Sequence, residues 1–164
     1  MPSIKLLGVI VDSNLTFNQN TEAPIIAYNQ SLFALRFMKQ HGLADSMLQL
    51  VFKSTVIPKL FYAGPSWHGF VSKSIMDRYE ALIRKAIRLG YYKTSEPGAQ
   101  GLLERADLNL FTQHILQNTG HILYSLLPVK RNLSYSLRGS WHGRDIGEKD
   151  ERNFINRMLY KNIY

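Results

Sequence analysis

The sequence predicts a mainly α-helical protein in which a short N-terminal β-strand or hairpin is followed by a multi-helix bundle. Three observations indicate this fold class. Residues 4–12 are rich in β-branched and apolar side chains, as in a buried strand. Most later segments space their apolar residues as a helix does, between capping residues and glycine or proline stops. The 164 residues, 45% of them hydrophobic, suffice to bury a core.

The first segment, IKLLGVIVD at residues 4–12, is apolar on both faces, which suits a strand inside a sheet. Gly8 interrupts it and indicates a bulge or a close approach of another part of the backbone. No later segment resembles a second strand, so we expect the partners of this strand to lie outside the chain. We also expect the unpaired apolar strand to promote self-association.

Residues 21–40 are expected to form the first helix, because Thr21 can cap its start and Gly42 follows its end. Its apolar side chains spread around much of the circumference, which predicts a well-buried helix. A second helix should begin at residues 45–46, and Pro58 should kink or end it.

The clearest helix runs from Ser74 to Leu89 and stops at Gly90. Its apolar side chains fill one half of the circumference, which predicts packing against residues 47–52 of the second helix. Charged side chains fill the other half. The basic side chains of that outer half are Arg78, Arg84, Lys85 and Arg88.

The last third of the chain is expected to hold further helices. A short one opens near Ser95, Asp107 caps the next, and Asp150 caps the last. Residues 129–149 are polar, contain three glycines and show no period, so we expect an extended or mobile stretch there.

Positive charge is concentrated in about a quarter of the chain. The net charge is +8, and residues 51–93 hold eight basic against two acidic side chains, which is net +6. Concentrated Lys and Arg are typical of nucleic-acid binders, although a solvated basic surface is the alternative. Tyr91 and Tyr92 follow the basic helix beside Arg88 and Lys93, so they are candidates for stacking on bases, or else part of the core.

Several kinds of chemistry have no support in the sequence. There is no cysteine, no apolar run of about 18 residues, no glycine-rich phosphate loop and no HExxH pattern. No two aspartates are adjacent, and the acidic pair Asp150-Glu151 is explained as a helix start. We therefore expect no catalytic residue, metal, cofactor, small-molecule substrate or membrane partner. No signal peptide is evident, which favours an intracellular location.

Particular strings resemble the C-terminal region of the reverse transcriptase of LINE-type (non-LTR, jockey-like) retrotransposons. KLLGVIVD at residues 5–12 is similar to the K-x-L-G-V strand that closes the palm of these enzymes, and LTF follows at residues 15–17. STVIPKLFYA at residues 54–63 resembles the thumb pattern S-x-V-x-P-x-L-x-Y-A. Three further strings follow in the family's order: PSW at 65–67, LIRKAIR at 82–88 and RNFINRMLY at 152–160.

The resemblance implies a domain organisation. Residues 1–13 would be the remnant of the palm-closing strand, residues 14–93 a helical thumb-like domain, and residues 94–164 a helical C-terminal extension. Within the first part, Leu7, Gly8 and Val9 would be the primer grip, which holds the 3′ end of the primer.

The resemblance also implies a function. The parent protein would be a Mg²⁺-dependent RNA-directed DNA polymerase, expected in the nucleus, whose fingers and palm precede Met1. This chain would be a catalytically incomplete fragment, not an enzyme by itself, that binds the backbone of a template–primer duplex of RNA and DNA without sequence specificity. The missing palm and fingers would be its protein partner.

Two other readings remain open. The chain could be a helical protein-interaction module derived from a transposon, with a basic surface that meets an acidic protein. It could also be a hydrolase with a scattered Ser–His–Asp triad, although no nucleophile-elbow pattern supports this.

Overall fold

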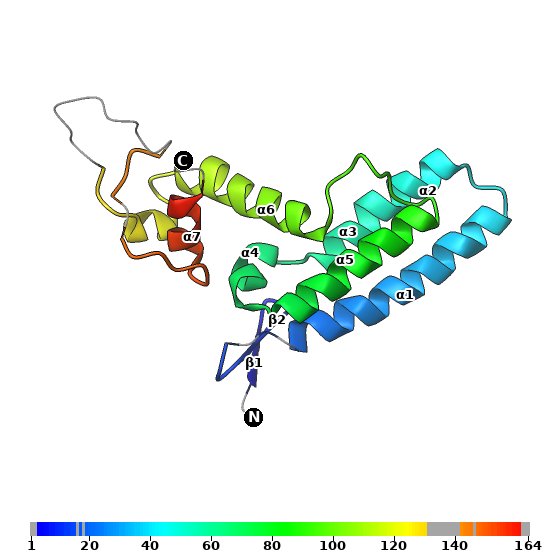
Figure 1. Ribbon diagram of the computed structural model, residues 1–164, viewed down its shortest axis with the longest axis horizontal. Coiled ribbons are helices and arrows are strands. Elements are labelled where there is room, and N and C mark those ends of the chain that lie inside the picture. Colours follow the sequence, from blue (N-terminus) through cyan, green and yellow to red (C-terminus); the bar gives the residue numbers. More distant parts are fainter. Residues whose placement is uncertain (1–2, 16, 18, 131–141, 146, 162–164) are drawn as a thin grey trace. The chain divides into compact units, whose positions relative to one another are not determined.

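The computed structural model (Figure 1) describes residues 3–15, 17, 19–130, 142–145 and 147–161, and confirms a mainly α-helical fold with an N-terminal pair of strands. The chain divides into two compact units, residues 1–103 and 104–164. This division falls between Leu103 and Glu104, whereas the sequence predicts a boundary between residues 93 and 94. None of the described helices is both long enough and apolar enough to span a lipid bilayer.

The N-terminal segment is a hairpin, which is one of the two forms predicted for it, and the expectation that no second strand follows within the chain is wrong. Strands β1 (Ser3–Leu6) and β2 (Val9–Asp12) pair antiparallel, with Leu6 opposite Val9. Leu7 and Gly8 form the turn with φ values of +47° and +88°, which match a right-handed twist between the strands. The partner of the strand is therefore within the chain.

The hairpin is anchored through β2. Val9 and Val11 pack against the core, and the side-chain amide of Asn20 both accepts from the backbone N–H of Ile10 and donates to its carbonyl oxygen. Asn20 thus satisfies backbone groups at the outer edge of β2, as a neighbouring strand would. Strand β1 is exposed along its whole length.

Helix α1 (Gln19–Gln40) begins two residues before the expected cap, and Thr21 lies inside it as a buried residue. Only one side of α1 is buried, through Tyr28, Leu32 and Leu35. The expectation that this helix is well buried is wrong. The large apolar side chains exposed on it are Ile26, Phe33, Phe37 and Met38.

The next helical segment continues through Pro58 instead of ending there. Helix α2 (Asp45–Val51) leads into the π-helical turn η1 (Phe52–Val56) and then into α3 (Ile57–Leu60). A proline ring clashes with the carbonyl group four residues earlier in an α-helix. The wider π-helical turn makes room for it, because its hydrogen bonds span five residues.

A short connection leads to the basic helix. It contains α4 (Gly64–Trp67) and the 3₁₀ turn η2 (His68–Phe70), after which α5 spans Lys73–Arg88. Ser72 caps α5, two residues before the expected start, by accepting from the N–H of Ile75.

The end of α5 is a Schellman motif, as the glycine predicts. Gly90 has φ +80°, its N–H bonds to the carbonyl of Ile87, and the N–H of Tyr91 bonds to the carbonyl of Ala86.

The core of unit 1 is centred on aromatic rings. Tyr79 of α5 is fully buried, with its ring 5.5 Å from that of Phe61 and 5.8 Å from that of Trp67. Phe52 belongs to the same core, as its place in the second helix predicts, whereas Met47 is 51% exposed.

Unit 2 begins within α6 (Ala99–Asn109), since the division follows Leu103. Helix α6 continues into the π-helical turn η3 (Leu110–Ile115), and the 3₁₀ turn η4 (Ile122–Leu126) and α7 (Phe154–Tyr160) follow. The buried side chains are Phe111, Ile115, Ile155, Met158 and Leu159.

Two expected helix starts in this region are wrong. Asp107 lies inside α6 and is 2% exposed, because Arg157 of α7 pairs with its carboxylate at 3.0 Å. Asn153, not Asp150, caps α7 by accepting from the N–H of Ile155.

The expected mobile stretch at residues 129–149 lies partly outside the described residues. Within the described part, Arg144 is buried and donates to the carbonyl oxygen of Pro128 at 2.7 Å. His142 is also buried and bonds to the carbonyl oxygen of Leu159 at 2.9 Å. These residues are therefore anchored to the core of unit 2.

Candidate nucleic-acid interface

Helices α1 and α5 run side by side and in the same direction (Figure 1). The Tyr28 hydroxyl donates to the carbonyl oxygen of Leu82. Two further contacts join the helices, and the residues that make them are seven positions apart in each helix. Arg78 donates to Glu22, and Lys85 donates to the side-chain oxygen of Asn29 at 3.3 Å. These contacts fix which face of each helix borders the other.

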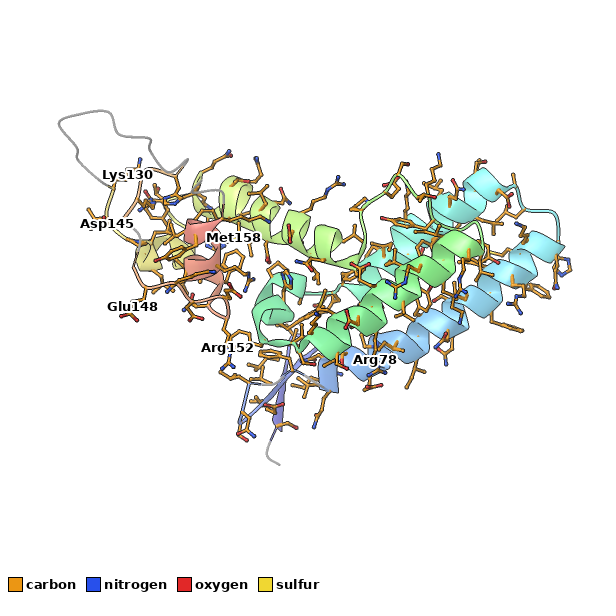
Figure 2. All side chains as sticks on the ribbon, viewed as in Figure 1. Arg78, Lys130, Asp145, Glu148, Arg152 and Met158 are labelled. Carbon is orange, nitrogen blue, oxygen red and sulfur yellow. The ribbon has the colours of Figure 1, made fainter. Side chains whose placement is uncertain are left out.

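Arg78, which is labelled in Figure 2, forms an ion pair with Glu22 within unit 1. Its two terminal nitrogens donate to the two carboxylate oxygens of Glu22, at 2.6 and 3.1 Å. The hydrogen bonds from Arg78 lower the pKa of Glu22, and Glu22 in turn raises the pKa of Arg78. Both groups are therefore charged at neutral pH and neutralise each other. Arg78 is therefore already paired within the chain, and its contact with a phosphate stays a prediction.

The remaining basic side chains of the predicted face have different surroundings. Arg84 and Arg88 are exposed on the side of α5 that faces away from the core, and neither makes a hydrogen bond or ion pair with a described residue. Lys85 is half-buried beside Asn29. Lys93 is exposed beyond the end of the helix. Of the predicted contact residues, Arg84, Arg88 and Lys93 are thus exposed and have no side-chain partner among the described residues, and we call these three the basic face.

Tyr91 and Tyr92 are not part of this surface, which corrects the prediction that they stack on bases. Each is 3% exposed. The ring of Tyr92 lies 5.6 Å from that of Phe52, and its hydroxyl donates to the carbonyl oxygen of Pro97 at 3.0 Å. The turn at Gly90 directs the chain back onto the core, so both rings fill it.

Exposed aromatic rings lie instead on α1, where sequence reasoning did not place them. Phe33 is 73% and Phe37 is 55% exposed, and Ile26 is 59% exposed. At 100° per residue these three side chains share one stripe, next to Asn29 and hence next to α5. The signal was present in the sequence, because α1 carries more apolar residues than one buried side can hold.

The tip of the hairpin is a second candidate contact. Leu7 is 93% exposed and has φ +47°, a conformation that asparagine or glycine adopts at lower cost than leucine. The hydroxyl of Tyr62 donates to the carbonyl oxygen of Leu7 at 2.9 Å. A Cβ atom on Gly8 would lie 3.3 Å from the Tyr62 ring. Val9 is half-buried against the core, whereas Leu7 and Gly8 are exposed, so of the three predicted primer-grip residues Leu7 presents the exposed side chain.

A cavity of about 540 Å³ lies behind this tip, between β2, the start of α1 and the region of α3. Most of its lining is apolar, and Pro24, Leu60 and Trp67 contribute to it. Lys5 and Lys59 also line it, one from the hairpin and one from α3, and no acidic residue does. The pocket behind the hairpin tip therefore combines an apolar surface with two cationic side chains.

No cluster of three or more potential metal ligands occurs among the described residues. No known protein family, curated protein or solved structure matches this chain. The resemblance to LINE-type reverse transcriptases accordingly rests on the sequence strings alone.

Proposed function

We propose that this chain is a catalytically incomplete part of a retrotransposon reverse transcriptase that binds the backbone of an RNA–DNA template–primer duplex. The observation that carries this proposal is the pair of exposed cations, Arg84 and Arg88, one turn apart on α5. Like charges at this spacing destabilise a helix by about 0.2–0.5 kcal/mol, and a phosphate between them reverses that effect. The ordered set of sequence strings supplies the identity of the partner.

The proposal assigns separate tasks to two surfaces of unit 1. The basic face of α5 contacts phosphates, so affinity depends on salt and hardly on sequence. The hairpin tip at Leu7, with Lys5 and Lys59 nearby, contacts the end of the primer strand. Catalysis and Mg²⁺ binding belong to an upstream palm, because the carboxylate pairs that bind two metal ions are missing from this sequence.

The test is equilibrium binding of a fluorescently labelled RNA–DNA hybrid across a salt series. The variant is Arg84→Gln/Arg88→Gln, because glutamine keeps helix propensity and avoids repulsion from Glu80 one turn earlier. We expect the slope of log affinity against log salt to fall by about 2 units, since each lost phosphate contact removes about 0.9.

A matched control is Arg105→Gln/Lys130→Gln, which removes the same charge from exposed positions of unit 2. Circular dichroism of each variant confirms that it is folded. Equal losses in both variants would mean that only net charge matters, and unchanged binding in both would reject the proposal.

The alternative is a protein-interaction module whose basic face binds an acidic protein. The exposed cations are as compatible with an acidic protein as with a nucleic acid. The sequence strings, in contrast, favour only the nucleic acid. A poly-glutamate competitor distinguishes the two: displacement of hybrid at equal charge concentration indicates a general polyanion site, and retention of the hybrid indicates recognition of the nucleic-acid backbone.

A further inference from the structure

We propose that the exposed aromatic stripe of α1, formed by Ile26, Phe33 and Phe37, is a stacking platform for unpaired bases of a single-stranded nucleic acid. This inference rests on the proposed function, because it places single-stranded nucleic acid beside the face that binds duplex backbone. It adds a second type of contact on a different helix.

The stripe has no partner within the described chain. The three side chains remain 55–73% exposed, although the opposite side of the same helix is fully buried through Tyr28, Leu32 and Leu35. An exposed apolar stripe on a small unit lowers solubility, so its presence calls for an occupant. The ring of Phe37 lies 4.3 Å from that of His41, which extends the aromatic surface toward the end of the helix.

Cations lie along the side of this stripe that borders α5. Arg36 is exposed on α1 three residues after Phe33, and it makes no hydrogen bond or ion pair with a described residue. Lys85 of α5 donates to the side chain of Asn29 on α1, and Asn29 lies one turn before Phe33. Because the two helices run parallel, the next turn of each brings Phe33 and Arg88 to the same level.

The acidic groups near the stripe are already paired. Glu22 is bound by Arg78, and Asp45, which follows the end of α1, is bound by Lys39 at 2.9 Å. The side chains left to meet an occupant are therefore aromatic, apolar, cationic or, as with Asn29 and Gln30, neutral and polar, and none is an unpaired acid. This combination complements an occupant that offers flat apolar surfaces and negative charge together.

A single strand meets that description better than a duplex does. In a duplex the bases are stacked and paired, so only phosphates reach a helix surface and the phenyl rings gain no contact. In a single strand each base has a free face that can stack on an aromatic ring while its phosphate meets an Arg or Lys. The spacing of Phe33 and Phe37, one helical turn, lets each ring take a separate base.

The experiment uses the full chain and single-stranded DNA that carries the fluorescent base 2-aminopurine, with an RNA–DNA hybrid measured in parallel. Stacking on Phe33 or Phe37 changes the emission of 2-aminopurine directly. We expect Phe33→Ser/Phe37→Ser to weaken single-strand binding about ten-fold or more and to abolish the emission change, because one base–aromatic stack contributes roughly 5- to 100-fold in affinity. Hybrid binding should change less than about two-fold, since it depends on phosphate contacts.

Two control variants make the result specific. Met47→Ser/Leu50→Ser removes two side chains of α2 that are 51% and 60% exposed, and it should leave single-strand binding unchanged. Phe33→Leu keeps an apolar side chain but removes the ring, and it should lose most of the emission change. If Phe33→Leu bound single strands and changed the 2-aminopurine emission as the parent does, the contact would be a general apolar one and the stacking proposal would be overturned.

The outcomes separate this inference from the proposed function. If Phe33→Ser/Phe37→Ser binds single strands as the parent does, the stacking platform does not exist. The proposed function is still supported in that case if the salt dependence of hybrid binding falls when Arg84 and Arg88 are replaced. If the serine variant changes only the oligomeric state in sedimentation, the stripe is a contact between copies of the chain and the inference is overturned. If hybrid binding does not depend on Arg84 and Arg88 but single strands still stack on Phe33 and Phe37, the proposed function fails and the stacking platform is retained.

Discussion

The Tyr62 hydroxyl donates a hydrogen bond to the carbonyl oxygen of Leu7 and so ties the turn of the hairpin to the segment that follows α3. The same ring limits the space at the neighbouring glycine, where a Cβ atom would lie 3.3 Å from Cε1. Gly8 also has φ +88°, a value that side chains other than glycine adopt only with strain. One aromatic residue therefore fixes both the position and the composition of the turn.

Gly8→Ala should destabilise the hairpin, because the methyl group meets both the backbone strain and the Tyr62 ring. We expect a cost of about 1–3 kcal/mol, seen as faster amide hydrogen exchange in β2. Tyr62→Phe keeps the ring but removes the bond to Leu7, and it should cost about 1 kcal/mol, or roughly five-fold faster exchange. Unchanged protection of β2 in both variants would show that the hairpin does not depend on this contact.

Asn20 should be required for the hairpin to stay attached to α1. Its amide bonds to both the N–H and the carbonyl of Ile10, and Asn20→Ala would leave these two backbone groups without a partner. We expect a loss of about 1–3 kcal/mol. The exchange rate of the Ile10 amide is the direct readout, and Asn14→Ala, at an exposed position in the following turn, is the control. An Ile10 amide that is equally protected in Asn20→Ala would contradict the assignment.

Tyr79 should limit the stability of unit 1 at high pH. Burial raises the pKa of this phenol from 10.0 to about 12. Because the folded state holds the proton more tightly than the unfolded state, the full stability is present below pH 10 and is lost as the pH rises from 10 toward 12. The loss amounts to about 1.4 kcal/mol per pH unit within that window.

The measurement for this prediction is urea unfolding between pH 8 and 12, followed by the fluorescence of Trp67 in a Trp141→Phe background. Tyr79→Phe should reduce the pH dependence between 10 and 12 relative to the parent. The lysines and the buried phenol of Tyr28, whose pKa is also raised by burial, contribute equally to both proteins. An identical slope in the two proteins would mean that Tyr79 ionises without unfolding.

The fold class could be predicted from sequence because its signals are local. The outer and inner halves of α5 follow from periodicity, and its end at Gly90 follows from the left-handed conformation that glycine adopts. The sequence could not distinguish a single strand from a hairpin at residues 3–12, because Leu7 occupies a turn position where asparagine or glycine is usual. A leucine there extends the apolar run and makes two strands resemble one.

The site was predicted in part, and the failures have a common physical cause. Arg84 and Arg88 are exposed as the helical period predicts, but the period cannot show that Arg78 finds Glu22, a residue 56 positions away. Nor can it show that the chain after Gly90 turns inward, which buries Tyr91 and Tyr92. The exposed rings Phe33 and Phe37 were missed because a sequence shows how many apolar residues a helix has, and not how much of the helix its neighbours cover.

Unit 2 should depend on the pair formed by Asp107 of α6 and Arg157 of α7. The two groups are 3.0 Å apart, and their side chains are only 2% and 17% exposed. Arg157→Met would remove the cation and leave a buried carboxylate, which costs about 3 kcal/mol or more. The amides of α7 should then exchange more than about 100-fold faster. Asp107→Leu/Arg157→Met should restore most of the protection, because replacing both partners removes the buried charge.

The pair Lys149 and Glu151, which is exposed in the same unit, provides the control, and Lys149→Met should leave exchange in α7 nearly unchanged. If Arg157→Met and Lys149→Met behave alike, the buried pair does not hold α6 and α7 together.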